Sequence, residues 1–525
     1  MIRISNIKLP PEYTGADIEK RLRRIGVKNQ EYVLSRLSLD ARKKEEIHYL
    51  ASFDLESGSG LRPYGGAGIS EINERPYTAP EHGVSELSGR PVIIGAGPAG
   101  MFAGLLLALY GYAPLIIERG APADERMKTV NEFWENGSLD PDSNPCFGEG
   151  GAGTFSDGKL TTGIKDKHGR IRQILRWFCE AGADEDILYW HKPHLGSDRL
   201  PGIMMNIRKK TEAAGGEYRF HTRAEKLILK DGAVRGLLIK NSAGKPEELS
   251  CGCVILACGH SARDTIRMLY SQGVPVEAKN FAVGLRIEHP AAMISRAQYG
   301  EQYKKLPTAD YKLTGRSDDG HGVYSFCMCP GGSVINSSTE AGMICVNGMS
   351  LKARDGRNSN SAIVVGVGPA DFGEGVFAGM DMQRKLEKAA WRAGNGNIPV
   401  QLLGDFMNGK GSVQLGDIQP DIKGAYSLSN LREVLTDGLS SSIISVMPYF
   451  GKRIEGFDRY DAVLSGVESR TSSPVRINRD ANYESSIKGL FPCGEGAGYA
   501  GGITSAAADG MKTAEEIIGR YRPWI

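Results

Sequence analysis

The sequence has neither a cysteine framework nor a metal-binding pattern. Its nine cysteines form an odd set without a CxxC pair, and its nine histidines are scattered along 525 residues. Cysteines in such a pattern are typical of a compartment that keeps thiols reduced, so we expect no structural disulfides. Because the histidines are scattered, we also predict no metal site.

Long apolar runs and an excess of charge are also missing. No stretch reaches the roughly 18 apolar residues of a membrane span, and the first residues lack the apolar core of a signal peptide, so a cytoplasmic location is expected. With Lys+Arg 64 against Asp+Glu 62, the overall charge gives no reason to expect a membrane or nucleic-acid partner. Glycine is abundant instead, with 68 residues, well above the usual fraction of about 7%.

The length predicts two to four domains, and most of the chain alternates strand-like and helix-like segments, as in an α/β protein. Residues 1–56 are expected to form a small α/β unit, and the Gly- and Pro-rich residues 57–88 a linker. The unit's elements are expected near residues 2–8 (strand), 15–25 (helix), 31–37 (strand) and 47–55 (strand). The basic segment 38–44 is interpreted as a solvated connection, with a nucleic-acid contact as the minor alternative.

The strongest pattern is a glycine-rich turn between an apolar strand and an apolar helix. Gly95 permits the tight turn, Gly97 lets the backbone approach a pyrophosphate, and Gly100 allows close packing of helix and strand. The helix begins at Pro98 and Ala99, where free N–H groups favour phosphate. The next strand ends at Glu118 and Arg119, and the Glu118 carboxylate suits ribose hydroxyls. The pattern predicts a dinucleotide site, and its acid disfavours a 2′-phosphate.

A second glycine-rich segment lies at residues 489–510 and resembles the second FAD motif of the glutathione-reductase-like superfamily. The resemblance implies that Gly494 and Glu495 bind the ribityl and pyrophosphate region, although many relatives carry Asp at the latter position. It also implies that Gly502 and Ile503 begin a helix aimed at the flavin pyrimidine edge. A helix N-terminus stabilises the negative charge that gathers there on reduction.

Two further pieces resemble the same superfamily. The strand 254–257 leads into Cys258-Gly259, and a β-hairpin is predicted around Asp231-Gly232. By the resemblance, Gly259 lies at the cofactor, and Arg223 or Ala224, beside the start of the hairpin, contacts the adenine through its backbone. The implied fold is a discontinuous Rossmann-type FAD domain, a parallel sheet with helices and a β-hairpin insertion. Its parts are residues 89–275 and 466–525, and an α+β substrate-binding domain at 276–465 lies between them.

More specific strings resemble a bacterial family described as uncharacterised FAD-dependent dehydrogenases, with a distant likeness to geranylgeranyl reductases. These strings occupy residues 147–160, 259–265, 286–290, 327–332, 347–350 and 468–476. The resemblance places the first string near the flavin, so that Gly151, Gly153 and Lys159 join the predicted cofactor-binding residues.

Three residues are candidates for catalysis. The resemblance to geranylgeranyl-reductase-like flavoproteins places Cys329 beside the isoalloxazine, as an acid or as a packing group. His260 would titrate near neutral pH and serve as a general acid, or would simply begin a helix. Arg470 has the planar fork that binds a substrate carboxylate or the flavin, with an interdomain ion pair as the alternative.

The predicted function is an FAD-dependent dehydrogenase or reductase that exchanges a hydride between flavin N5 and a small organic substrate, at a C–C or C–N bond. No second GxGxxG follows a strand, so NAD(P)H, if it is the electron donor, is expected to dock transiently. Two alternatives remain open: a flavin-dependent monooxygenase, and a flavoprotein that binds or acts on RNA through its N-terminal domain.

Overall fold

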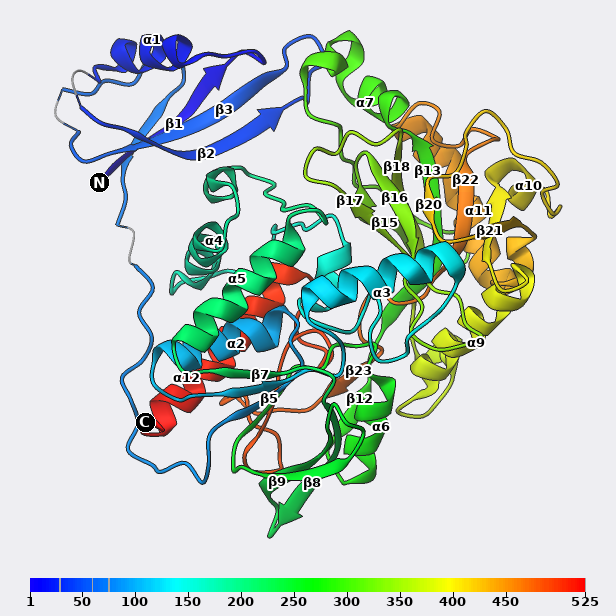
Figure 1. Cartoon of the computed structure of the whole chain (residues 1–525). Helices are drawn as coiled ribbons and strands as arrows, with labels where there is room; N and C mark the ends of the chain where they lie inside the picture. The colour runs from blue at the N-terminus through cyan, green and yellow to red at the C-terminus, as the bar shows by residue number, and fades with distance from the viewer. Residues whose placement is uncertain (28–29, 59, 74–75, 525) are drawn as a thin grey trace.

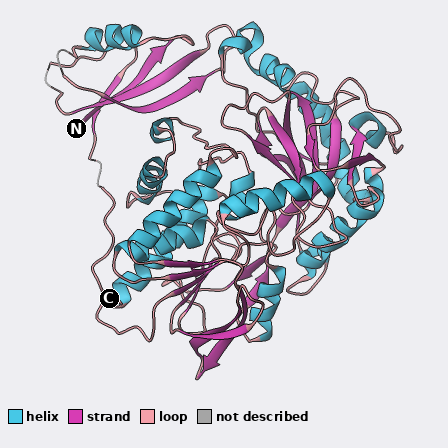
Figure 2. Cartoon of the chain, in the orientation of Figure 1, coloured by secondary structure: helices cyan, strands magenta, loops and turns pink. Residues whose placement is uncertain are grey.

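The computed structural model describes residues 1–27, 30–58, 60–73 and 76–524. Three units are visible: an N-terminal sheet with one helix, a parallel-sheet unit that contains the C-terminus, and a unit built on a large mixed sheet (Figures 1 and 2). Helix α3 lies in the middle of the view, between the parallel-sheet unit and the mixed sheet. Across the described residues, no helix is long and apolar enough to cross a membrane.

The N-terminal unit contains the predicted strands and helix, and it extends further along the chain than residue 56. Strand β4 pairs antiparallel with β1, so part of the expected linker belongs to this sheet; residues 59, 74 and 75 of that linker lie outside the described residues. A four-residue strand gives too short a pattern to be recognised in the sequence. The elements are β1 (Ile2–Leu9), α1 (Gly15–Ile25), β2 (Val33–Asp40), β3 (His48–Leu55) and β4 (Gly68–Glu71), with sheet order β2-β3-β1-β4.

The parallel-sheet unit has the predicted discontinuous Rossmann-type arrangement, because its sheet joins strands from both ends of the sequence. The strand order is β24-β11-β5-β6-β7, and all neighbours run parallel. The strands are β5 (Val92–Ile94), β6 (Leu115–Ile117), β7 (Glu217–Arg219), β11 (Val254–Leu256) and β24 (Leu490–Pro492). Four of these five strands are buried along their whole length, as expected where both faces of a parallel sheet are covered.

One face of this sheet packs against helices and the other against a small antiparallel sheet. Ile93 and Ile116 point into the helical layer, while Val92 and Ile94 point the opposite way, which is the two-residue period of a strand. The helices of the unit are α2 (Pro98–Leu109), α3 (Ala123–Asn136), α4 (Arg170–Glu180), α5 (Leu200–Ala213), α6 (Arg263–Ser271) and α12 (Ile503–Arg520). Of these, α6 packs on the side of the small antiparallel sheet. The predicted hairpin is confirmed as β8 (Arg223–Lys230) and β9 (Ala233–Lys240), with β10 (Pro246–Ser250) beside it.

The inserted domain is built on a seven-stranded mixed sheet with a smaller sheet beside it. The large sheet has the order β14-β15-β18-β13-β22-β19-β21 and the small one β17-β16-β20. The strands are β13 (Phe281–Pro290), β14 (Thr314–Arg316), β15 (Gly322–Cys329), β16 (Gly332–Asn336), β17 (Val346–Ser350), β18 (Asn358–Val367), β19 (Ile398–Leu402), β20 (Ile422–Lys423), β21 (Tyr426–Leu428) and β22 (Val463–Glu468). The helices are α7 (Ala291–Tyr299), α8 (Pro369–Phe372), α9 (Ala378–Ala393), α10 (Leu403–Met407) and α11 (Asp437–Arg453).

Two short strands join the inserted domain to the parallel-sheet unit. β12 (Val276–Ala278) leaves that unit and β23 (Val475–Ile477) returns to it, and the two pair antiparallel. β22 ends at Glu468, a few residues beyond the expected boundary at 465. The return segment after Glu468 therefore begins directly at the junction of the two units.

Candidate functional site

A cavity at the junction connects the parallel-sheet unit with the inserted domain. Its empty space is about 1510 Å³, open mouth included. The predicted cofactor-binding residues line it with one exception, Gly100. A Cβ on Gly100 would lie 2.0 Å from the carbonyl oxygen of Gly95, so this glycine serves the close packing of helix on turn that the pattern predicts.

The start of α2 forms one wall of the cavity and suits a phosphate. Gly97 is the N-cap, and no side chain caps the helix, which leaves N–H groups of the first turn facing the cavity. A Cβ on Gly97 would meet no atom closer than the Gly151 Cα, at 3.9 Å. Packing therefore does not require glycine at this position, whereas a ligand that approaches the backbone does. The cradle fits the pyrophosphate of a dinucleotide.

Glu118 holds the glycine turn together as well as lining the cavity. Its Oε2 accepts a hydrogen bond from the Ala96 N–H (2.8 Å), and its Oε1 accepts from the N–H groups of Gly120 (2.9 Å) and Gly148 (3.0 Å). A carboxylate has about four acceptor positions, so Oε2 retains one for a ribose hydroxyl. Arg119 lies beside it, with Nη2 2.8 Å from Thr265 Oγ1.

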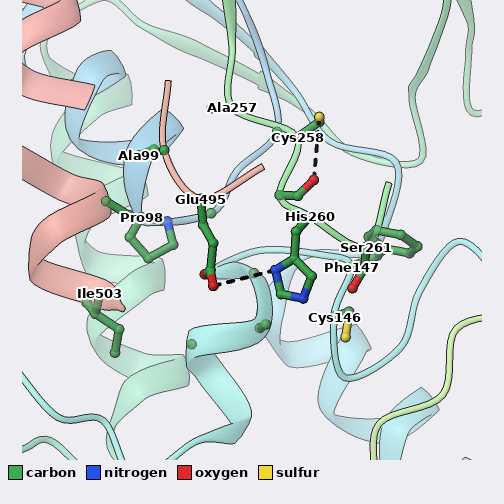
Figure 3. A pocket seen from close by; sticks show the side chains of 18 of the residues that line it. Pro98, Ala99, Cys146, Phe147, Ala257, Cys258, His260, Ser261, Glu495 and Ile503 are labelled. Atoms are coloured by element: carbon green, nitrogen blue, oxygen red, sulfur yellow. Dashed lines mark hydrogen bonds and ion pairs between the residues drawn. The ribbon is translucent and has the colours of Figure 1, made fainter. Parts of the chain in front are cut away.

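The start of α12 lines the cavity next to the start of α2, with Ile503 on the same side as Pro98 (Figure 3). Gly502 precedes the helix with φ +81° and without a side-chain cap. Glu495 lies close by, and its Oε1 is 3.6 Å from His260 Nδ1, the contact drawn in Figure 3. Burial raises the pKa of Glu495 to about 7. This wall fits the ribityl and flavin end of FAD, as the second glycine-rich segment predicts.

His260 has a different environment from the one the sequence suggests. Burial, together with the positive charges of Arg470 and Arg263, lowers its pKa to about 3. The imidazole is therefore neutral near pH 7 and has no proton to give as a cationic acid. The expectation that it titrates near neutral pH is wrong, because burial and Arg470, which comes from a distant segment, are not visible in the local sequence around His260.

The loop that contains Lys159 continues the wall towards the inserted domain. Gly151 and Gly153 lie in a 3-10 turn (η1, Gly151–Phe155), and Lys159 Nζ lies 2.9 Å from Asp157 Oδ2. Lys159 also donates to the Met328 carbonyl of β15. Although burial raises the pKa of Asp157, its ion pairs with Lys159 and Arg354 hold it at about 2. Asp157 is thus a buried anion between two cations.

Arg470 forms the interdomain ion pair and not a free anion-binding fork. Its Nε and Nη2 donate to the two carboxylate oxygens of Glu387 on α9, at 2.9 and 2.8 Å. Its Nη1 donates to Thr339 Oγ1 (2.8 Å) and Ser261 Oγ (3.2 Å). Arg263 binds the same carboxylate at 2.7 Å. Because these donors are engaged, Arg470 has the second of its two predicted roles, that of an interdomain ion pair.

The thiol at the cavity is Cys327 and not the predicted Cys329. Cys329 is fully buried, while Cys327 lines the cavity. A β-bulge between Phe326 and Cys329 causes the difference, because one extra residue reverses the faces on which side chains lie. Sequence reasoning also overlooked Asp157 and Asn347, although both lie in strings that it had noted.

Residues 280–471 match the family described as "FAD-dependent protein, C-terminal domain-like". The chain is 44% identical to an uncharacterized protein of Clostridium beijerinckii over 536 residues, which cover 99% of each chain. Within the described residues, no group of three or more His, Cys, Asp or Glu could hold a metal ion.

Among solved structures, the chain is similar to a geranylgeranyl bacteriochlorophyll reductase-like protein of Thermoplasma acidophilum, with 11% identity and a TM-score of 0.36 over 82% of this chain and 78% of that one. It is also similar to a glycine oxidase of Bacillus cereus, with 12% identity and a TM-score of 0.32 over 82% and 94%.

The fold and the cavity define a protein with a discontinuous Rossmann-type dinucleotide unit and an inserted second domain. At 44% identity over its full length, the chain belongs to the same family as the Clostridium relative. Its inserted domain matches the domain family of FAD-dependent proteins, and FAD is the dinucleotide that both this match and the cradle indicate.

Proposed function

We propose that this chain is an FAD-dependent oxidoreductase that exchanges a hydride between flavin N5 and a small organic substrate, at a C–C or C–N bond. One observation carries the proposal: a single cavity is lined by the dinucleotide cradle at one end and by side chains of the inserted sheet at the other. Those side chains are Phe326, Cys327 and Asn347. A substrate held between the two units would lie against both, which is where ligands commonly bind.

FAD supplies two-electron redox chemistry when bound, and the protein supplies binding and orientation. The start of α2 and Glu118 hold the adenosine and pyrophosphate end. The start of α12 adds the positive end of a second helix dipole to the cavity. The hydrogen bond from Lys159 to the Met328 carbonyl holds the inserted sheet against the cofactor loop, and the ion pair with Asp157 orients the lysine.

The electron donor is part of the proposal. The sequence offers one dinucleotide fingerprint, at Gly95–Gly100, and the residues that it predicts form the cradle assigned to FAD. We therefore propose that NAD(P)H docks transiently, if it is the donor, and does not occupy a second dedicated unit.

Anaerobic stopped-flow spectroscopy tests this function. The purified holoenzyme is reduced with NADH, with NADPH or, failing both, with dithionite, and is then mixed with enones, enoates and cyclic imines. Reoxidation of the flavin by one of these classes, with a reduced organic product, is the expected result. Failure of every organic acceptor, together with rapid oxygen consumption and a hydroxylated product, would show a monooxygenase instead.

A further inference from the structure

Four of the strings that characterise this sequence meet at one buried guanidinium, that of Arg286. Its Nη1 donates to Glu468 Oε2 (3.0 Å) and to Asn347 Oδ1 (3.3 Å). Its Nη2 donates to the Cys327 carbonyl (2.8 Å), and its Nε to Asn360 Oδ1 (2.8 Å). Arg286 has no exposed surface, so it contacts the cavity only through the residues that it holds.

Asn347 presents a hydrogen-bond donor to the cavity as a result. Its Oδ1 accepts from Arg286 and from the Gly348 N–H (2.8 Å). Within the described part of the chain, no acceptor pairs with its Nδ2, and Asn347 lines the cavity. Gly348 fits the same arrangement, because a Cβ there would lie 2.3 Å from Arg286 Nη2. The guanidinium thus orients the amide with its hydrogens towards a ligand.

Cys327 reaches the cavity through a strained backbone. Its φ is +43°, in the left-handed region that few residues other than glycine adopt. Backbone strain of this kind collects at functional sites. The bulge of β15 accounts for the conformation, and bulges beside active sites commonly redirect a side chain. Here the bond from Arg286 to the Cys327 carbonyl stabilises the bulge.

We propose that Cys327 and Asn347 are the acid–base and carbonyl-binding residues for a substrate oxidised at the C–C bond next to a carbonyl group, and that Arg286 is the positioning residue for both. The inference rests on the proposed function and narrows its substrate class. In the oxidative direction the α-carbon loses a proton to Cys327 Sγ, and the β-carbon loses a hydride to oxidised FAD. A C=C bond forms between these carbons, and the thiol later releases its proton to solvent.

The basicity of the Cys327 thiolate indicates a substrate that contains a carbonyl group. The neighbouring Cys329 thiol and the charges of Lys159 and Arg286 outweigh burial and lower the pKa of the Cys327 thiol below its ordinary value. A thiolate of this basicity removes only a proton that a neighbouring group acidifies. An α-carbonyl does so, and the negative charge that develops on its oxygen requires a donor. Asn347 Nδ2 is such a donor.

Several titratable or charged groups face Cys327 from the elements packed around it. They are Cys329, Lys159, Arg286, Asp157, Glu468 and Glu495. Burial raises the pKa of Glu468 to about 7 in spite of its ion pair with Arg286. A pH profile of activity would therefore reflect the titration of more than one group. For this reason the Cys327 thiol must be titrated directly.

Alkylation of the oxidised holoenzyme titrates that thiol. Iodoacetamide labelling, read for each cysteine by mass spectrometry, is followed between about pH 5 and pH 9. We expect Cys327 to be labelled with a midpoint below the ordinary thiol value of about 8.5, and R286M to raise this midpoint more than R286K does. Cys179, on α4 and outside the cavity, is the reference thiol. An unlabelled Cys327, an ordinary midpoint, or a midpoint that R286M leaves unchanged would overturn the inference.

Reoxidation by a defined probe tests catalysis. The reduced holoenzyme is mixed with cyclohex-2-enone in D₂O, which runs the step in reverse, so that Cys327 returns the proton. We expect solvent deuterium at the α-carbon, and a loss of about 10²–10⁴-fold in the reoxidation rate in C327S. N347L should also lower the rate, while flavin content is retained and C179S reacts as wild type.

The outcomes separate the inference from the proposed function. An unchanged rate in C327S overturns the role of the thiol while leaving the function intact. Reoxidation by 1-pyrroline but not by the enone overturns the carbonyl class and again leaves the function intact. If no organic acceptor reoxidises the wild-type enzyme, the proposed function itself fails, whatever the alkylation shows.

Discussion

Arg470 and Glu387 form a two-point ion pair, with donor–acceptor distances of 2.9 and 2.8 Å, across the junction of the two units. Glu387 is fully buried, and the Arg470 side chain is 5% exposed. The pair joins the segment that returns to the parallel-sheet unit with helix α9 of the inserted domain. Its partners Arg263 and Glu340 extend it into a network.

Removal of one charge from this pair should destabilise the protein strongly. We expect E387Q to lower the free energy of unfolding by about 3–5 kcal/mol, because it leaves two buried guanidinium groups without their carboxylate. Chemical denaturation with a double-mutant cycle against R470M measures the coupling. The exposed pair of Arg296 and Glu301 is the control, and R296A should change stability by less than about 1 kcal/mol. An equally small effect of E387Q would contradict the assignment.

The Glu387 carboxylate should also determine how the free energy of unfolding changes at acid pH. Arg470 and Arg263 outweigh burial and lower the pKa of Glu387 far below its usual range. A lowered carboxyl pKa contributes stability that is complete above the unfolded value, about 4.5, and is lost as the pH falls below it towards the folded pKa. Wild type should therefore lose stability more steeply than E387Q in this window. Parallel curves for the two proteins would show that the pKa of Glu387 is the same in the folded and unfolded states.

Gly97 predicts whether the cofactor can bind. G97E should give folded protein without bound flavin, because its side chain would occupy the place where the pyrophosphate meets the backbone. A Cβ built on Gly202 of α5 likewise meets no close atom, with none within 4 Å, but Gly202 does not line the cavity, so G202E is the matched control. The absorbance ratio of flavin to protein measures occupancy. A normal ratio in G97E would show that the start of α2 does not bind the phosphates of the cofactor.

His260 should remain neutral throughout the physiological range. Its pKa of about 3 means that the unfolded chain takes up a proton near pH 6.5 while the folded protein does not, so this residue lowers stability as the pH falls below about 6.5. Nitrogen-15 NMR of labelled histidines, assigned with H260N, measures the pKa. An imidazole that titrates between about pH 6 and 7 would restore the general-acid interpretation.

His321 should show the opposite pH dependence. It lies between Asp319 (Nδ1, 3.2 Å) and Asp371 (Nε2, 3.0 Å), whose carboxylates raise its pKa. A raised histidine pKa contributes stability that is fully present below the unfolded value of about 6.5 and is lost as the pH rises through the folded pKa. The Tm difference between wild type and H321Q should therefore shrink with rising pH. A difference that does not vary with pH would show that the contact is not ionic.

The glycine turn was predictable because its conformation depends on local geometry. Gly95 has φ +104°, and Gly100 meets the carbonyl of Gly95, so the reason for each glycine lies within six residues. The predicted strands and helices of the N-terminal unit were found for the same reason: each has its own periodic pattern. Strand β4, with four residues, has no pattern long enough to read.

The chemistry at the flavin end was not predictable in this way. Whether Cys327 or Cys329 reaches the cavity depends on a bulge fixed by the pairing of β15 with β18. The neutral state of His260 depends on Arg470, more than 200 residues later in the sequence. Such properties arise only when distant segments come together, and a single sequence contains no local signal for them.

The strand order of the parallel sheet limits when the cavity can form during biosynthesis. Its strand β24 and the helix α12, whose start forms a wall of the cavity, come from the last 36 residues of the chain. Domains generally fold as units, N-terminal first, while the ribosome is still working. The N-terminal unit and the inserted sheet can follow this order. The cavity cannot, because one of its walls comes from α12 (Ile503–Arg520), so the cofactor is loaded only after this segment has left the ribosome.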